Sequence, residues 1–382
     1  MNATAQAVAQ GNAMPFYHAM RAGLVVALTG FATGSAVAAS GIRTFDNWIV
    51  GCDNTLACRA IGTMAGEGDG GSYVVIDRAA GPEATAKLRF VRESAPAGDA
   101  QGLVLSVDAG PALTLAGTAF RVIEQEFDDK PEASELVEPA AVARVIEAMG
   151  KGRALRFGKE APRANAPAVS LDGFAAALQF IDTAQGRLDT VTALVARGAR
   201  AAATVSAPPA VPFLTVAMPN PTRPAPTVVP RALVQRHVRE TRDDECDLGN
   251  RAPATRIVRL SNSTVLYQIG CWRAASQAGA MFYLATEAQP ANARRVDFET
   301  LDAETGRMGQ PIQTLTSPSG LEEMSAATLS ALHKDRGAGD CGTAASWAWT
   351  ARGFRLSAYA TMPACKGVPP EDWITLWRTE PR

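Results

Sequence analysis

The stretch Cys52-Asp-Asn-Thr-Leu-Ala-Cys58 decides how this chain folds, because it places two cysteines on either side of a short turn. The three residues after Cys52 carry side chains that favour turns. Before it, Trp48, Val50 and Cys52 alternate with the period of a β-strand. We therefore predict a strand that leads into a turn closed by a disulfide.

All six cysteines follow an apolar N-terminal stretch, and an even number in an exported chain is typical of disulfides. No pair has the Cys-x-x-Cys spacing of redox or zinc sites, and no histidine lies near a cysteine pair at zinc spacing. We therefore predict three disulfides and no metal site. Sequence order favours the pairs Cys52–Cys58, Cys246–Cys271 and Cys341–Cys365, of which turn residues support only the first.

The first 39 residues have the pattern of a secretory signal peptide. Arg21 precedes the apolar run 22–31, and small residues follow it as far as Ala39. A start codon assigned too early, ahead of Met14 or Met20, would explain the long stretch before Arg21. We predict cleavage; the alternative is an uncleaved anchor, which needs about 20 strongly apolar residues.

Composition excludes some partners and suggests two domains. The formal charge is −1, from 37 basic and 38 acidic residues, so no global basic field attracts nucleic acid. No segment after the signal is apolar enough to span a membrane. Residues 199–230 are rich in Pro and Ala and cannot bury a core. We predict that they link an N-terminal domain, residues 40–198, to a C-terminal domain, residues 231–382.

The N-terminal half combines strands with helices. Residues 45–126 alternate as strands do, with Gly-Pro turns between them. Pro139 suits the first position of a helix that ends near Met149, just before a glycine. Ser170 can cap a second helix, and a short third helix is predicted over residues 189–197. We expect the helices to cover one face of the N-terminal sheet.

The C-terminal half continues mainly as strands. Val265, Tyr267, Ile269 and Cys271 alternate clearly, and residues 325–333 are predicted as a helix. The fold class is therefore mainly β with α (α+β). It consists of two disulfide-stapled β-rich domains, with helices packed on the N-terminal sheet and a Pro/Ala-rich linker.

Few side chains point to catalysis. Only His237 and His333 follow the signal, and a serine or cysteine nucleophile would need one of them as its base. His237 lies beside the flexible linker and His333 ends a predicted helix, so we assign neither a catalytic role. P-loop, EF-hand and His-Glu-x-x-His motifs are absent. Residues 66–71 are glycine-rich but precede a strand, which predicts a hairpin turn and not a dinucleotide site.

Pairs of acids are the remaining route to catalysis, since glycosidases use two carboxylates. Neighbouring acids without a signature are typical of solvated surface, and we interpret the basic residues between 231 and 242 in the same way. We predict no catalytic, cofactor-binding or metal-binding residue and no cofactor. The acid pairs are Asp128–Asp129, Asp243–Glu245, Glu322–Glu323 and Glu371–Asp372.

Six tryptophans either pack in the β core beside disulfides or line a binding cleft. Core packing is the simpler interpretation. A cleft lined by indole rings would suit a glycan or a peptide. The candidates for ligand contact are Trp272, Trp347 and Trp349.

Several segments carry a family resemblance. Together they resemble a bacterial envelope family described as domain of unknown function 1176 (DUF1176), over nearly all of the chain after the signal. The opening motif is also similar to that of the invasion-associated locus B family of exported proteins. Neither resemblance implies a known reaction. The segments are Phe45-Asp-Asn-Trp-Ile-Val-Gly-Cys-Asp-Asn-Thr-Leu-Ala-Cys-Arg-Ala60, Ser170-Leu-Asp-Gly-Phe-Ala-Ala-Ala-Leu178, Gln185-Gly-Arg-Leu-Asp-Thr-Val-Thr-Ala-Leu-Val195, Gly270-Cys-Trp272, Trp347-Ala-Trp349 and Trp373-Ile-Thr-Leu-Trp-Arg-Thr379.

The signal and the cysteines predict a periplasmic or secreted protein. Because no constellation of catalytic residues is present, we expect a non-catalytic protein that binds an unknown envelope protein, peptide or glycan. The alternatives are an envelope hydrolase that attacks cell wall or glycan with paired carboxylates, and a structural or inhibitory protein with an exposed apolar patch. Residues 273–280 differ from the Gly-Ala-Tyr-Asn run usual in the family, so the resemblance assigns that loop no binding role.

Overall fold

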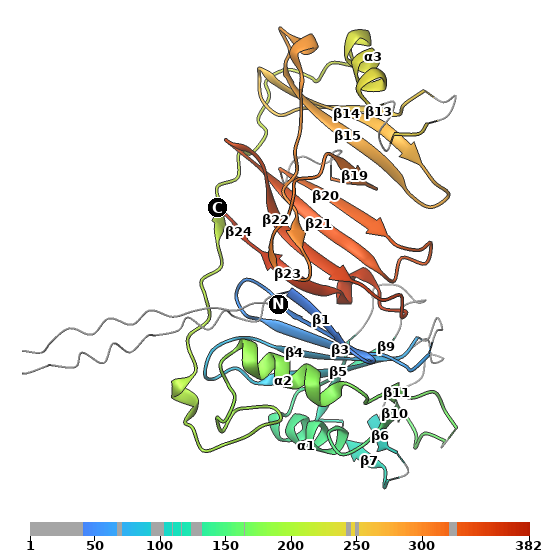
Figure 1. The fold of residues 1–382 in the computed structure, drawn as a ribbon, viewed down its shortest axis with the longest axis vertical. Helices are drawn as coiled ribbons and strands as arrows, with labels where there is room; N and C mark the ends of the chain where they lie inside the picture. Colours follow the sequence, from blue (N-terminus) through green and yellow to red (C-terminus); the bar gives the residue numbers. More distant parts are fainter. Residues whose placement is uncertain are drawn as a thin grey trace, which may run out of the picture. The chain divides into compact units, whose positions relative to one another are not determined.

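The computed structural model describes residues 41–66, 71–92, 103–108, 110–115, 117–123, 132–163, 165–241, 246–248, 252–320 and 327–382. The predicted signal segment and most of the glycine-rich turn at 66–71 lie outside these residues. The described part is mainly β, with three α-helices and several antiparallel sheets (Figure 1). The predicted α+β class is confirmed.

The N-terminal half is built on a seven-stranded antiparallel sheet among the described residues, in the order β1-β2-β3-β4-β5-β9-β8. Alternate residues of these strands face opposite sides of the sheet, as the period of two predicted. The strands are β1 (Gly41–Phe45), β2 (Trp48–Cys52), β3 (Cys58–Gly62), β4 (Tyr73–Arg78), β5 (Ala86–Arg92), β8 (Phe120–Ile123) and β9 (Glu132–Leu136).

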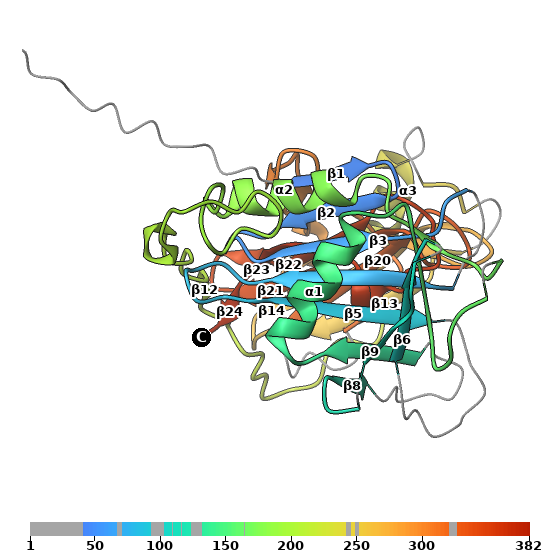
Figure 2. The ribbon, with the colours of Figure 1, turned by 90° about the horizontal axis from the view of Figure 1, so that it is seen from below.

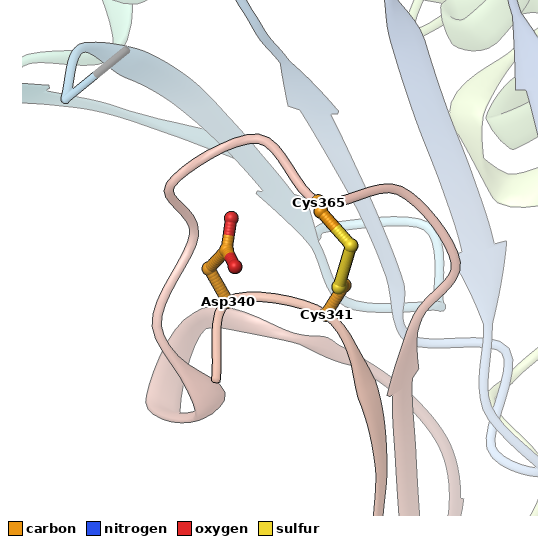
Figure 3. Close-up of side chains that lie close together, drawn as sticks. All are labelled: Asp340, Cys341 and Cys365. Carbon is orange, nitrogen blue, oxygen red and sulfur yellow. A yellow bond between two sulfur atoms is a disulfide. The ribbon is translucent and has the colours of Figure 1, made fainter. Parts of the chain in front are cut away.

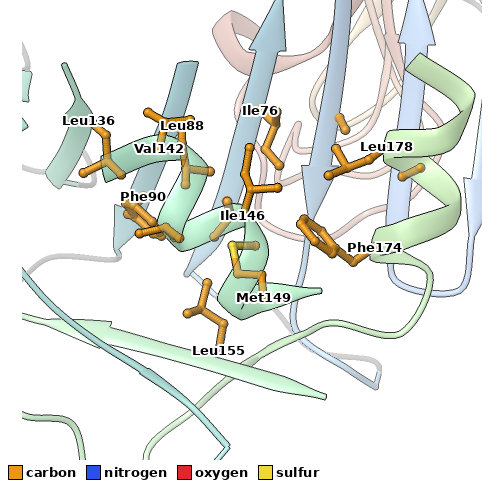
Figure 4. Packing of buried hydrophobic residues seen from close by; sticks show 14 of the residues in the cluster. Ile76, Leu88, Phe90, Leu136, Val142, Ile146, Met149, Leu155, Phe174 and Leu178 are labelled. Atoms are coloured by element: carbon orange, nitrogen blue, oxygen red, sulfur yellow. The ribbon is translucent and has the colours of Figure 1, made fainter. Parts of the chain in front are cut away.

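Two helices, α1 (Pro139–Met149) and α2 (Phe174–Ala184), cover one face of this sheet (Figure 2). Their apolar sides pack on strand residues such as Ile76, Leu88 and Phe90 (Figure 4). The predicted packing of helices on the N-terminal sheet is therefore confirmed. A smaller sheet completes this layer: β6 (Leu103–Val107), β7 (Leu113–Leu115), β10 (Ala154–Gly158) and β11 (Val169–Ser170), in the order β11-β10-β6-β7.

Trp48 shows how the residue opposite a large ring creates room for it. Trp48 pairs across the strands with Gly62, and a Cβ at Gly62 would lie 2.2 Å from the indole ring. The fully buried ring packs edge-on against Phe174, with centroids 4.9 Å apart, and its Nε1 donates to the carbonyl of Ser170 at 2.9 Å. Trp48 thus connects the N-terminal sheet to α2.

Two helix predictions in this half were wrong in detail. Ser170 is the last residue of β11 and not a cap; its Oγ accepts a hydrogen bond from the N–H of Asp172, and α2 begins later. Residues 189–197 form turns, not a helix. The N–H groups of Leu194 and Val195 donate to Asp182 Oδ2, at 2.7 and 3.2 Å. They therefore do not form the hydrogen bonds to preceding carbonyls that a helix requires.

The C-terminal half holds two larger antiparallel sheets and short pairs. One sheet has the order β13-β14-β15-β16 with β19 also on β15, and the other the order β20-β21-β22-β23. Their strands are β13 (Thr255–Arg259), β14 (Thr264–Arg273), β15 (Ala278–Thr286), β16 (Arg294–Arg295), β19 (Thr314–Thr316), β20 (Thr328–Lys334), β21 (Gly342–Thr350), β22 (Gly353–Met362) and β23 (Ile374–Arg378); β17 (Leu301–Asp302) pairs with β18 (Arg307–Met308).

The predicted helix at 325–333 was wrong. Its described part is β20, which pairs with β21 from Thr328 to Lys334, while Ser325 lies outside the described residues. Leu329 is fully buried in the core, so packing against the neighbouring strand decides the structure of this short segment, whatever its helix propensity.

The predicted linker, residues 199–230, is extended except for one 3-10 turn, η1 (Ala202–Thr204). It is held at several points. Its β12 (Phe213–Leu214) pairs in parallel with β24 (Glu380–Pro381), and the N–H of Ala217 donates to the carbonyl of Trp349 at 2.8 Å. The helix α3 (Arg231–Glu240) follows directly.

One buried cluster includes residues from both halves of the chain. Ile61, Tyr73 and Val75 from the N-terminal sheet belong to the same cluster as Trp373 and Leu376. Their contact is made by the sheet face that the helices do not cover. The division into domains 40–198 and 231–382 stays a prediction.

Candidate functional site

The structure contains the three disulfides that sequence order favoured. Cys52–Cys58, Cys246–Cys271 and Cys341–Cys365 are bonded, and no described cysteine is free. Three disulfides in one chain indicate an extracytoplasmic protein. Within the described ranges, no helix combines the length and the apolar character that crossing a bilayer requires.

The loop between Cys52 and Cys58 has a structural role. Asp53 Oδ1 accepts hydrogen bonds from Thr55 N and Ala57 N, at 2.8 and 3.1 Å, which fixes the turn. Asn54 then makes two hydrogen bonds with the backbone of Arg378, whose guanidinium also pairs with Asp53. The opening motif thus binds the last long strand of the chain.

The segment Gln185–Val195, which carries part of the family resemblance, contributes to a buried charge network. Arg78, Asp182 and Arg187 are at most 4% exposed, and Arg78 Nη1 lies 3.2 Å from Asp182 Oδ1. Arg187 donates to Gln185 Oε1 and Thr192 Oγ1, both at 3.0 Å, and to the backbone. Burial raises the pKa of Asp182, while Arg78 and two backbone N–H groups act in the opposite direction. Burial and the neighbouring arginines lower the pKa of Arg78 to about 10.

His237 is buried and holds α3 against the sheet below. Its Nδ1 lies 2.8 Å from the hydroxyl of Tyr283, and its Nε2 lies 3.1 Å from the carbonyl of Gly270. The neutral ring satisfies both contacts by donating to the carbonyl and accepting from the hydroxyl. His237 therefore has a structural role, because it links α3 to the strands β14 and β15.

The pH dependence of stability tests this role. Burial, with a smaller effect from Arg295, lowers the pKa of His237 below its unfolded value of about 6.5, although the Gly270 carbonyl and Glu240 raise it. The unfolded chain therefore binds more protons here, and stability is lost as the pH falls below about 6.5. Urea titrations at pH 7.5, 6.5 and 5.5 should show a steeper loss for wild type than for His237→Gln. The exposed His333→Gln should keep the wild-type slope, and equal slopes for all three proteins would contradict the assignment.

A pocket of about 360 Å³ lies over β14 and β15. Its floor consists of small residues, Gly270, Gly279 and Ala280 among them, and its wall includes Trp272. Strand register shifts between Gly270 and Trp272, which places Trp272 opposite Gly279. A Cβ at Gly279 would lie 2.1 Å from the indole Nε1, so only glycine lets this ring lie over the strand. The hollow thus results from a bulge and a run of small side chains.

Polar groups complete this pocket. Gln268, two residues before Gly270, lines it, and its Oε1 is buried without a hydrogen-bond partner among the described residues. Asp247 and Arg273 lie at its lining as well. A buried amide atom without a partner costs free energy unless a ligand or water supplies the missing bond. The pocket therefore combines an indole with an unsatisfied hydrogen-bonding group.

The other two candidate tryptophans are placed differently. Trp347 is only 1% exposed, lies among the core aromatics, and donates from Nε1 to the carbonyl of Glu299 at 2.7 Å. Trp349 is partly buried against Phe354, with ring centroids 5.1 Å apart. Trp347 also borders a pocket of about 280 Å³ that contains His333. The Trp272 pocket does not include either of them.

The acid pairs do not meet in a site. Three of the four pairs lie outside the described residues. In the fourth, Asp372 is buried and accepts hydrogen bonds from Tyr73 and Arg89, while Glu371 is exposed. A pocket of about 650 Å³ beside β3–β5 does gather acids, but two of them, Asp77 and Glu135, form ion pairs with arginines. An ion-paired carboxylate is poorly suited to supply a proton.

One group of described residues has the ligand types of a metal site, namely Asp340, Cys341 and Cys365 (Figure 3). Both sulfurs belong to one disulfide, so neither is a thiolate ligand. Asp340 is bound by Arg336 at 2.6 and 2.7 Å and by the N–H of Gly367 at 2.7 Å. These residues do not fit a metal ion in the oxidised chain.

The sheets and the three disulfides together indicate a β-rich extracytoplasmic protein. The chain belongs to the family "Protein of unknown function (DUF1176)", whose model matches residues 42–380. It is similar to the uncharacterized protein YpfG of Escherichia coli strain K12, with 28% identity over 362 residues, which is 90% of this chain and 94% of that protein. No solved structure matches the chain. The predicted family resemblance is confirmed.

Proposed function

We propose that this chain is an exported, periplasmic and non-catalytic binding protein of the bacterial envelope, and that its ligand is a glycan bound at Trp272. The single observation that supports this most is that the unsatisfied Gln268 and the indole of Trp272 line the same pocket. An indole offers an apolar face to the C–H groups of a sugar. A sugar hydroxyl can both donate and accept a hydrogen bond, so it satisfies the amide in either orientation.

The pocket has the size and chemistry of a small-molecule site. Its volume of about 360 Å³ lies at the lower end of the range for such sites, about 300–1,000 Å³. Asp247 and Arg273 add charged groups at the lining that can fix the orientation of polar substituents. A peptide would use an exposed strand edge or a longer groove, whereas this hollow is short.

The hydrolase alternative has less support. Glycosidases place two carboxyl groups on either side of the bond that they cleave. Asp247 is the one carboxylate that lines the Trp272 pocket among the described residues. A hydrolase would need a second carboxylate, which the described lining of this pocket does not provide, whereas a binding protein needs none.

Replacing Trp272 with alanine should weaken glycan binding by about tenfold or more, because losing a buried aromatic anchor costs at least about 1.4–2 kcal/mol. The measurement is isothermal titration calorimetry of the oxidised protein with soluble disaccharide-peptide fragments of peptidoglycan. The same fragments without their peptide, and the free peptide, show which part is bound.

The matched control is Trp349→Ala, which removes a partly buried indole outside the pocket. It should bind the fragments as wild type does. Equal losses in both variants, or binding of the free peptide alone, would contradict the glycan site. Release of a cleaved product, detected by mass spectrometry, would contradict the non-catalytic assignment.

A further inference from the structure

A second pocket, of about 290 Å³, lies where α1 begins. Pro139 and Val142 from the start of α1 line it, together with Arg78 and Arg197. It is separate from the Trp272 pocket and shares no residue with it. Three features of its surroundings point to one kind of ligand.

The first feature is an excess of buried positive charge. Arg78 and Arg187 share a single buried carboxylate, Asp182, which accepts from Arg78 through one oxygen and from two backbone N–H groups through the other. The other described hydrogen bonds of these two guanidinium groups go to uncharged oxygens, such as the carbonyls of Thr192 and Gly81, which solvate a cation but do not neutralise it. Within this buried network one formal charge is not neutralised, and an uncompensated buried charge is costly. The pocket lining also holds one carboxylate, the exposed Glu83.

The second feature is an unused donor. Arg78 is 4% exposed, its Nε has no hydrogen-bond partner among the described residues, and its side chain lines the pocket. Burial of a guanidinium donor without an acceptor costs free energy that an anionic ligand would recover.

The third feature is the start of α1. Its N-terminus has no side-chain cap, since Glu138 makes no capping hydrogen bond and Pro139 occupies the first turn. The first turn of α1 has no acidic residue. An uncapped N-terminus carries partial positive charge and free N–H groups, which favour an anion.

We propose that this pocket binds a phosphate-class oxyanion, free or as a monoester, through Arg197 at its mouth and Arg78 in its wall. Arg197 lies two residues after the segment Gln185–Val195. Its Nε donates to the carbonyl of Ala193 at 3.0 Å, which leaves the other guanidinium nitrogens for a ligand. Thr192 also lines the pocket, and its hydroxyl accepts a hydrogen bond from Arg187 of the buried network. This site is independent of glycan binding at Trp272.

The experiment titrates the full oxidised protein with inorganic phosphate, glycerol phosphate and acetate at matched ionic strength. Calorimetry should show binding of the phosphates and at least about tenfold weaker binding of acetate, because a tetrahedral dianion engages more donors than a carboxylate. Tighter binding of glycerol phosphate than of inorganic phosphate would identify a monoester as the ligand, and the reverse would identify the free ion. Equal affinity for acetate and phosphate, or no binding of either, would overturn the proposal.

Variants locate the site. Arg197→Gln should weaken phosphate binding by about tenfold or more, and Arg197→Lys should weaken it less. The matched control is Arg144→Gln, which removes an exposed cation from α1, the helix whose start lines the pocket, at a position outside the lining. If Arg197→Gln and Arg144→Gln bound phosphate equally well, the site would lie elsewhere and the proposal would fail. The wild-type titrations decide the question even if a variant folds poorly.

Discussion

Replacing Asp182 with alanine is expected to lower the free energy of unfolding by about 3–5 kcal/mol, the usual cost of breaking a buried ion pair on one side. Asp182 is fully buried. Its loss would leave Arg78 and Arg187 without a counter-charge and the N–H groups of Leu194 and Val195 without their acceptor. Urea denaturation followed by far-UV circular dichroism measures the change.

The matched control for this prediction is Glu147→Ala. Glu147 also lies on a helix of the N-terminal half and forms an ion pair with Lys151, but both side chains are exposed. Water screens an exposed pair of this kind, so it contributes little to stability, and the control should unfold almost as wild type does. If Asp182→Ala lowered the free energy of unfolding by less than about 1 kcal/mol, the prediction would be wrong. Water or a rearrangement of side chains would then stabilise the two arginine charges.

The second large effect is expected at Asp372, which joins distant parts of the chain. Its Oδ2 accepts from the hydroxyl of Tyr73 at 2.6 Å and from Arg89 at 3.1 Å, and its Oδ1 accepts from Arg89 at 2.5 Å. Burial, followed by the nearby carboxylate, raises the pKa of Tyr73, so the phenol stays protonated and donates. Asp372→Ala would leave a buried phenol and a mostly buried guanidinium unpaired, and should cost about 3 kcal/mol.

The neighbouring acid provides the control for Asp372. Glu371→Ala removes one negative charge at an exposed position one residue away, and should change the unfolding free energy by less than about 0.5 kcal/mol. Equal effects of the two substitutions in urea denaturation would mean that net charge matters here and the Tyr73 and Arg89 contacts do not. The pair Glu371–Asp372, considered as a catalytic candidate, thus divides into a surface residue and a core residue.

Short-range patterns predicted much of this fold. Trp48 and Val50, or Val265 and Tyr267, alternate because they face one buried cluster while the residues between them face another, and this period of two is visible in the sequence. The disulfides followed sequence order because each links segments that are neighbours in one half. Pro139 marked a helix start because its missing N–H costs nothing there.

The errors have a common physical cause. Residues 189–197 and 325–333 have helical spacing, but long-range partners decide their structure: Asp182 takes two N–H groups of the first, and β21 pairs with the second. Such partners lie far away in sequence, so local propensity cannot predict them.

The candidate sites were visible only in part. Trp272 was predicted as a ligand contact from its residue type, but Gln268 and Gly279 were not, because the pocket depends on a strand bulge and on register. The basic pocket at α1 was missed because Arg78 and Arg197 are 119 positions apart in the chain. The motifs that carry the family resemblance build the disulfide loop and the buried network, which explains why they reveal the family but no reaction.

The extended segment that precedes α3 behaves as a strap. Besides the pairing of β12 with β24, the carbonyl of Pro224 accepts from Arg259 Nε at 2.8 Å, and Thr222 binds Asn262. Residues inserted between two such attachment points would bulge outward at the surface, and the points themselves would stay where they are. Insertions between the attachment points should therefore disturb the fold less than substitutions at the residues that fasten the strap.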